Sequence, residues 1–263
     1  MRSFILSLPA RLQSSVIIGL TVVAAFAIAL VTRACVNPQQ IALDSTWITT
    51  VYGTLGTLYS VLLAFVVSGV WQSFSDAKTA VNSEANALAD LAFLIRHISA
   101  ARTEHVPQSA KSYIASVVER WDLLALATSG NLSAAEDVAP SHTLLKAILD
   151  VDPQGDRELQ LFAQALVLTG SWLDARRDRL RCAKGNTAGA LWGLLITGAF
   201  VLFTFHGLFA THSSVVWVLL LLGFSLIVGL SFYLIFSLDS PFSGRLSASP
   251  EPFKRLLRVF EQT

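Results

Sequence analysis

Histidine, cysteine and carboxylate side chains are the groups that could support acid–base, nucleophilic or metal-assisted chemistry, and their spacing assembles no such site. None of the five histidines lies four residues from another, the spacing that puts two zinc ligands on one helix face. The sequence also lacks the G-x-S-x-G turn that presents a nucleophilic serine. We therefore expect no enzyme activity, no catalytic residue, no bound metal and no other cofactor.

Composition instead places this chain of 263 residues in a membrane. It is 53% hydrophobic and 14% charged, whereas soluble domains carry about 25% charged residues. The net charge of +1 gives no reason to expect a nucleic-acid partner. Four apolar segments are long enough to cross a bilayer, and each is expected to be a helix because lipid offers the backbone no hydrogen-bond partners. They are Ser14 to Val31, Trp47 to Trp71, Thr187 to Ala210 and Ser213 to Leu238.

Two alternatives to four simple spans arise from single features. Arg2 and Arg11 precede the first segment as in a signal peptide, but its apolar run exceeds the about 7–15 residues of a signal core, so we interpret it as a retained helix. His206 is the one ionisable residue inside a segment, and it lies near the end, where an interfacial position explains it. A proton- or sodium-coupled transporter is therefore not indicated.

Basic residues set the expected orientation. The two loops on one side carry only Arg33 between them. Both termini and the long insert are therefore predicted to be cytoplasmic, which places Cys35 and Cys182 on opposite sides of the membrane. This divides the chain into residues 1–71 with two spans, 72–186 as a cytoplasmic helical domain, 187–238 with two spans, and a cytoplasmic tail over 239–263. The opposite, cytoplasmic side carries Arg2, Arg11, Lys78, Arg176, Arg177, Arg179, Arg181, Lys184, Arg245, Lys254, Arg255 and Arg258.

The insert is predicted to be all-helical. The second span continues without Gly or Pro from Gln72 to His97, and Pro107 is expected to separate it from a helix over about Ser109 to Ala127. A short helix over Ser141 to Leu149 and a turn around Gly155 precede a long helix that leads into the third span. The junction at Gly185 and Asn186 is a candidate kink. The final helix, Phe253 to Phe260, is expected to dock on this domain or, alternatively, to lie on lipid.

The second span carries a face of small, mildly polar residues. Gly53, Thr57, Ser60, Ala64 and Val67 recur at steps of four and three, which places them on one side of a helix. Such a face permits either close helix packing or, in several copies, a wet pore. A bulky face is expected opposite, formed by Leu55, Leu58, Leu62 and Phe65.

The cluster Arg176, Arg177, Arg179 and Arg181 also has two interpretations. The arginines can snorkel to lipid headgroups, or they can draw anions to a vestibule.

Three short motifs resemble those of bestrophins. The stretch from Ala64 to Phe74, with Ser68 and Trp71, is similar to the end of the bestrophin pore helix. The turn Asp239-Ser240-Pro241-Phe242-Ser243-Gly244 is similar to the turn after their last span. Glu84-Ala85-Asn86-Ala87-Leu88 resembles the bacterial bestrophin-like domain family. The resemblance extends over nearly the whole chain.

The resemblance implies a homopentamer in a bacterial inner membrane, with a central pore lined by the second span and passive flow of ions, typically anions. Its pore-lining residues are expected to be Gly53, Thr57, Ser60, Val61, Ala64, Val67 and Ser68. Two departures matter. The bulky neck positions of the family fall on Gly53, Thr57 and Val61, none of which is aromatic, and Arg245 to Ser249 lacks the carboxylates of a calcium clasp. The alternative is a non-conducting scaffold whose helical insert binds a partner.

Overall fold

The computed structural model describes residues 10–36, 45–98, 103–127, 138–183, 189–209, 213–243 and 246–261, and these residues form helices and connections without strands. Gly244 and the Gly185–Asn186 junction lie outside these ranges. The chain divides into two compact units. Unit 1 comprises residues 1–72 and 186–239, and unit 2 comprises residues 73–185 and 240–263. The C-terminal tail thus belongs to the same unit as the insert.

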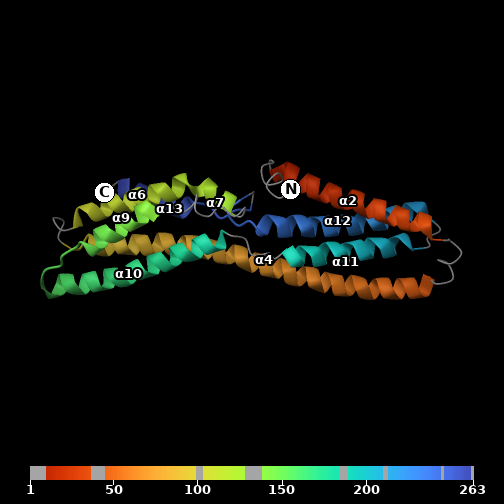
Figure 1. The fold of residues 1–263 in the computed structure, drawn as a ribbon, viewed down its shortest axis with the longest axis horizontal. Helices are drawn as coiled ribbons and strands as arrows, with labels where there is room; N and C mark the ends of the chain where they lie inside the picture. The colour runs from red at the N-terminus through yellow and green to blue at the C-terminus, as the bar shows by residue number, and fades with distance from the viewer. Residues whose placement is uncertain are drawn as a thin grey trace. The chain divides into compact units, whose positions relative to one another are not determined.

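Unit 1 is a bundle of apolar helices. It contains α2 (Ala10–Cys35), the first part of α4 (Ser45–Ile95), α11 (Gly189–Gly207) and α12 (Ser214–Leu238), and α2 packs against both α11 and α12 (Figure 1). All four helices are long and apolar enough to cross a membrane. Each of the four segments predicted from hydropathy therefore lies in a helix of the expected kind.

Close packing in unit 1 depends on two glycines. The Tyr59 hydroxyl of α4 donates a 3.0 Å hydrogen bond to the Leu195 carbonyl of α11, and a Cβ built on Gly198 would lie 2.6 Å from the Tyr59 ring. A Cβ on Gly207 would lie 2.5 Å from the Ala29 carbonyl oxygen of α2. Small residues of this kind let helices approach in lipid, where van der Waals contact drives association.

Replacing Gly207 with alanine is expected to destabilise the protein by about 1–3 kcal/mol, because the new methyl group meets backbone that cannot move aside. Thermal unfolding of the purified protein in detergent measures this. The matched control is Gly193→Ala, where a Cβ meets nothing within 4 Å and the helix gains up to about 1 kcal/mol of propensity. Equal unfolding temperatures for the two variants would contradict the packing described here.

Helix α4 is continuous over 51 residues. At 1.5 Å per residue it extends about 75 Å, more than twice the about 30 Å of bilayer hydrocarbon. Ser45–Gln72 belongs to unit 1 and Ser73–Ile95 to unit 2. The prediction that the second span runs on without a break is confirmed.

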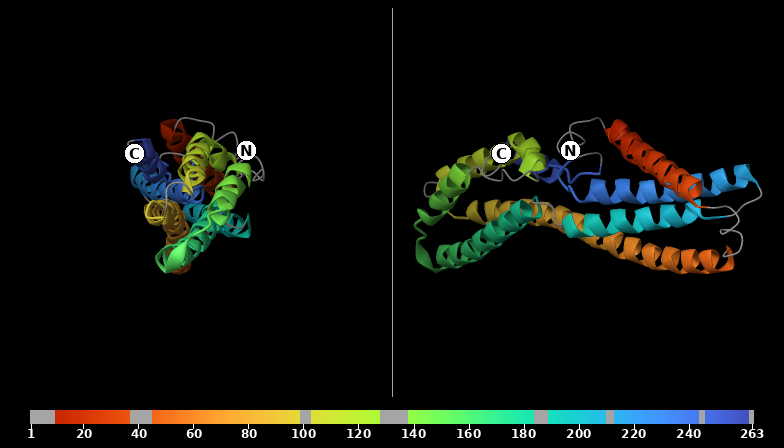
Figure 2. Two further views of the ribbon diagram at one scale, coloured as in Figure 1. Left: turned by 90° about the vertical axis from the view of Figure 1, so that its left-hand side faces the viewer. Right: turned by 45° about the vertical axis from the view of Figure 1, so that its right-hand side comes forward.

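Unit 2 surrounds the second half of α4 with five helices: α6 (His105–Glu119), α7 (Trp121–Ala127), α9 (Val138–Leu149), α10 (Gly155–Cys182) and α13 (Glu251–Glu261), drawn in two further views in Figure 2. α6 packs against α9 and α13. The core includes Leu88, Ile114, Trp172 and Phe253, none more than 1% exposed. Gly155 begins α10 with a φ of 76°, a conformation that favours glycine.

Two predicted boundaries in unit 2 are wrong. Pro107 lies in the first turn of α6 rather than before the helix. An amide N–H in that turn has no acceptor within the helix, so proline loses nothing there. The predicted helix over Ser109 to Ala127 is also interrupted at Arg120, which separates α6 from α7.

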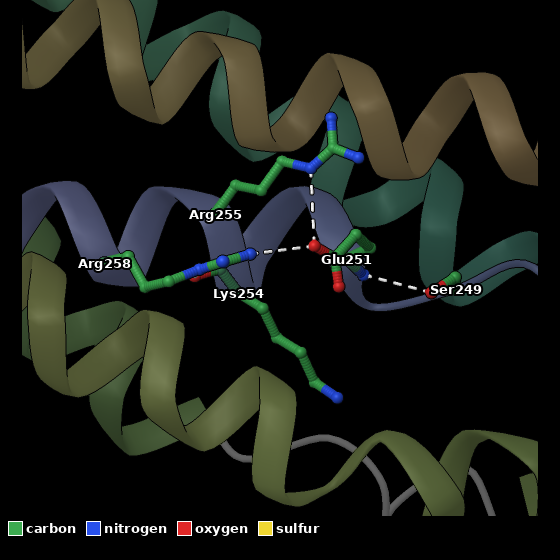
Figure 3. Close-up of polar contacts among 5 residues, drawn as sticks. All are labelled: Ser249, Glu251, Lys254, Arg255 and Arg258. Carbon is green, nitrogen blue, oxygen red and sulfur yellow. Dashed lines mark hydrogen bonds and ion pairs between the residues drawn. The ribbon is translucent and has the colours of Figure 1, made fainter.

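Helix α13 is strongly amphipathic and its apolar side is buried in unit 2. Phe253 and Leu256 are in the core. On the exposed side, one Glu251 carboxylate oxygen accepts from Arg255 Nε at 3.4 Å and from Arg258 at 2.8 Å (Figure 3). Of the two positions considered from the sequence, the structure has this helix on the helical domain.

Candidate functional site

The spanning part of α4 buries only one face in the single chain. The buried side chains are Tyr59, Leu63, Val66 and Val70, which recur at steps of four, three and four. This face packs within unit 1, and the remainder of the helix circumference is open. The open part is where any ion path or neighbouring subunit must meet α4.

One open strip consists of small residues. Gly53, Thr57, Ser60, Ala64 and Ser68 are all exposed. Val61 is 50% exposed at the edge of this strip, and Val67 is half-buried at the other edge. Six of the seven residues expected along a pore therefore remain uncovered by their own chain. We call Gly53, Thr57, Ser60, Ala64 and Ser68 the small strip.

The predicted bulky opposite face does not pack inside the chain. Leu58 and Phe65 are 63% and 74% exposed, and Leu55 and Leu62 are half-buried. The buried face instead lies between these two pairs, because Tyr59 and Leu63 are rotated away from Leu58 toward α11. α4 thus presents two different exposed strips, one small and one large and apolar, to surroundings outside the single chain.

The hydroxyl groups of the small strip are satisfied within their own helix. Thr57 Oγ1 donates to the Gly53 carbonyl at 2.9 Å, and Ser60 Oγ donates to the Gly56 carbonyl at 2.6 Å. They need no partner on another helix, which weakens the interpretation of the strip as a hydrogen-bonded packing seam. Their oxygen lone pairs point outward and can accept hydrogen bonds from water.

A buried ion pair fixes α4 in unit 2. Arg179 of α10 donates from Nε to Glu84 Oε2 at 2.6 Å and from a terminal nitrogen to Oε1 at 3.2 Å, and the Tyr113 hydroxyl of α6 donates to the same carboxylate. Arg179 also lies 5.8 Å from the ring centre of Phe253 in α13. The two charged side chains are 5% and 0% exposed. Four helices therefore converge on Glu84.

Burial shapes the ionisation of this group. Burial raises the pKa of Tyr113 well above its usual range, and the neighbouring Glu84 charge raises it further. Burial alone would lower the pKa of Arg179, but the Glu84 carboxylate raises it above its ordinary value. Tyr113 thus stays a neutral donor and Arg179 stays a cation, the states in which both can hydrogen-bond to the carboxylate.

The predicted basic cluster divides accordingly. Arg179 points into the core of unit 2. Arg177 and Arg181 are exposed and pair with Asp174 at 2.8 Å and Asp178 at 3.0 Å. Arg176 is half-buried. Exposed pairs of this kind contribute about 0–1 kcal/mol, so these arginines remain available to a lipid surface or to permeating ions.

Comparison with known proteins settles the family. Residues 19–253 match the bestrophin-like domain. The chain belongs to the bestrophin-like family. No curated protein matches it.

Solved structures agree on the fold. A crystal structure of a variant bacterial bestrophin homologue from Klebsiella pneumoniae superimposes with a TM-score of 0.66 at 12% identity, over 93% of this chain and 94% of that one. A second crystal structure, described as a membrane protein, gives 0.65 at 13% identity over 93% and 96% of the two chains. A further Klebsiella pneumoniae variant gives 0.62 at 14% over 94% and 95%. At such identities these likenesses concern the fold.

In this bestrophin-like chain the turn after α12 is a structural anchor. Asp239 caps α12, with its N–H donating to the Ile235 carbonyl at 2.9 Å. Phe242 is buried edge-on against Trp121, with ring centres 5.5 Å apart. Pro241 accepts from the Ala248 N–H at 2.7 Å.

Sequence reasoning missed three residues of this arrangement. Trp121 was expected only as a helix-face residue, yet its Nε1 donates to the Ala248 carbonyl at 3.3 Å and its ring holds the turn. Tyr113 and Glu84 were noted without being connected. The available signal was the position of a carboxylate on the otherwise apolar inner face of α4, between Val81 and Leu88. Among the residues that the structure describes, no three histidine, cysteine or acidic side chains cluster as metal ligands.

Proposed function

We propose that this protein is an oligomeric ion channel that conducts ions passively along the small strip of α4. The observation that carries the proposal is an uncharged, hydroxyl-bearing strip that the chain leaves exposed along its spanning helix. Membership of the bestrophin-like family supports it.

Conduction requires several copies of the chain. The small strip lies on the outside of a single chain, where lipid would cover Thr57 and Ser60. Arranging copies around an axis turns it into the wall of a shared lumen, and closed rings are the usual outcome for identical subunits. Following the bestrophin resemblance, we propose five copies in a bacterial inner membrane, with both termini and unit 2 cytoplasmic.

We further propose a modest preference for anions. The spanning segment Ser45 to Trp71 contains no carboxylate that would concentrate cations. A hydroxyl can serve either ion, since it accepts through its lone pairs and donates after rotation. Arg176, Arg177 and Arg181 add positive potential at the cytoplasmic side, which raises the local concentration of anions.

Recording from purified protein in planar bilayers under a salt gradient tests the function. We expect discrete current steps and a reversal potential on the anion side of zero. Folded, inserted protein that remains electrically silent would remove the channel proposal. A reversal potential on the cation side would remove only the selectivity.

One observation favours a scaffold as the second candidate. On α10 of unit 2, Leu159 and Val167 are 58% and 61% exposed and Leu166 is 38% exposed. A partner protein or a neighbouring subunit would cover this face. Cysteine crosslinking from Val167 between copies of the chain supports the oligomeric channel, and its absence in protein shown to be monomeric supports the scaffold.

A further inference from the structure

A groove lined by aromatic rings opens at the end of unit 1 where α11 ends and α12 begins. Its volume is about 410 Å³, within the about 300–1,000 Å³ range of ligand sites. α4 contributes Tyr52, the end of α11 contributes His206 and Phe209, and α12 contributes Trp217, Phe224 and Ile227. The wall is almost wholly apolar, so its natural occupant is an apolar chain.

One polar atom in this groove has no partner. His206 is 4% exposed, and its Nδ1 lies 3.5 Å from the Tyr52 hydroxyl. Its Nε2 is buried and makes no hydrogen bond within the part of the chain that the structure describes. When Tyr52 donates to Nδ1, the ring proton sits on Nε2 and points a donor at the occupant. A buried donor requires an acceptor, so the occupant must carry an oxygen at this depth.

The length of the groove matches half of a bilayer. Its α12 side runs from Trp217 to Ile227, ten residues, or about 15 Å at 1.5 Å per residue. The hydrocarbon core is about 30 Å thick. Tryptophan and tyrosine favour the membrane interface, so Trp217 and Tyr52 mark the interfacial end and Ile227 the midplane end.

A positive charge stands at the interfacial end. The Arg33 guanidinium of α2 lies 5.2 Å from the centre of the Trp217 ring, and its side chain is exposed. The order along the groove is therefore a cation, a buried N–H donor and an apolar channel. A glycerophospholipid presents the complementary order of phosphate, ester carbonyl and acyl chain.

We propose that this groove binds one phospholipid of the outer leaflet. Arg33 meets the phosphate, His206 Nε2–H donates to an ester carbonyl, and the acyl chain lies along Phe224 and Ile227. A helix of a second copy would fill the apolar part but would leave Nε2 unpaired. This site is separate from the small strip of α4.

Photolabelling tests the site. The full-length protein is reconstituted in phosphatidylethanolamine–phosphatidylglycerol nanodiscs containing a phosphatidylethanolamine with a diazirine in its acyl chain, and crosslinked peptides are mapped by mass spectrometry. We expect labelling of Leu220 to Ile227. Gly223→Leu should reduce it about tenfold or more, the effect of losing about 1.4 kcal/mol of binding, because a side chain there enters the groove without meeting other atoms. The control Gly193→Leu is equally unobstructed but outside the groove and should label as the wild type does.

A second variant isolates the polar contact. Tyr52→Phe combined with His206→Phe keeps two rings while removing the hydroxyl and both ring nitrogens, and the two residues are each other's polar partners. We expect the protein to fold and to lose co-purified phospholipid faster during detergent washing, as followed by native mass spectrometry. Unlabelled groove residues in the wild type, equal labelling of Gly223→Leu, or unchanged lipid retention in the double variant would each overturn the proposal. None of these readouts depends on current, so they stand apart from the channel test.

Discussion

Replacing Glu84 with alanine is expected to destabilise unit 2 by about 3–5 kcal/mol, since it strands a buried guanidinium without its counter-charge. Arg179 then loses both of its bonds to the carboxylate, and Tyr113 loses its acceptor. Chemical unfolding of the full-length protein in detergent, followed through tryptophan fluorescence, measures the change. Trp172 is a suitable reporter because its ring lies 5.1 Å from that of Tyr113.

The matched control is Glu251→Ala. It breaks an ion pair of similar length on α13, but there the carboxylate is 42% exposed and the arginines are 73% and 62% exposed, so the expected cost is about 0–1 kcal/mol. A double variant, Glu84→Leu with Arg179→Met, removes both charges and should recover much of the loss. If Glu84→Ala and Glu251→Ala unfold alike, the buried pair does not hold these helices together.

A cysteine at Thr57 should bring ionic current under the control of attached charge. We expect a cationic methanethiosulfonate to lower cation permeability and an anionic one to lower anion permeability, each about tenfold or more. A unit charge about 4 Å from the ion path at an effective dielectric constant of 20 changes the ion energy by about 4 kcal/mol, above the about 1.4 kcal/mol of a tenfold effect. Bilayer recording before and after the reagent is the measurement.

The background for this experiment is Cys35→Ser with Cys182→Ser, because Cys35 is exposed and would react. Burial raises the pKa of the half-buried Cys182 thiol, which slows its reaction without abolishing it. The control is Phe65→Cys, which is as open as Thr57 in the single chain but on the other exposed strip. Equal responses at Thr57 and Phe65 would mean that the small strip is not the ion path.

The elements of this fold that could be predicted are those fixed by local pattern. Uninterrupted hydropathy predicted the four apolar helices, and the absence of Gly and Pro after Gln72 predicted the continuation of α4. Pro107 misled because proline signals a helix start as readily as a break. The resemblance to bestrophins is confirmed at the level of the family, from motifs near Trp71, Glu84 and Pro241.

The candidate site was only partly predictable. A period of three and four places the small strip on one side of α4, but it does not say which other side is buried, because Leu58 and Leu63 are equally apolar. Only the position of α11 decides that Tyr59 and Leu63 turn inward. The Glu84–Arg179 pair joins residues 95 positions apart, and no local pattern connects them. The lining of a pore by Thr57 and Ser60 stays a prediction.

The unbroken course of α4 has a mechanical consequence. Glu84 follows Thr57 by 27 residues on one helix without proline, so the two lie about 40 Å apart on a single rod. A helix without a kink resists torsion, and a turn imposed on one end appears at the other. Any event that shifts the ion pair at Glu84 therefore rotates Thr57 and its neighbours by the same angle, which exchanges hydroxyl groups for the bulk of Val61 at one radial position.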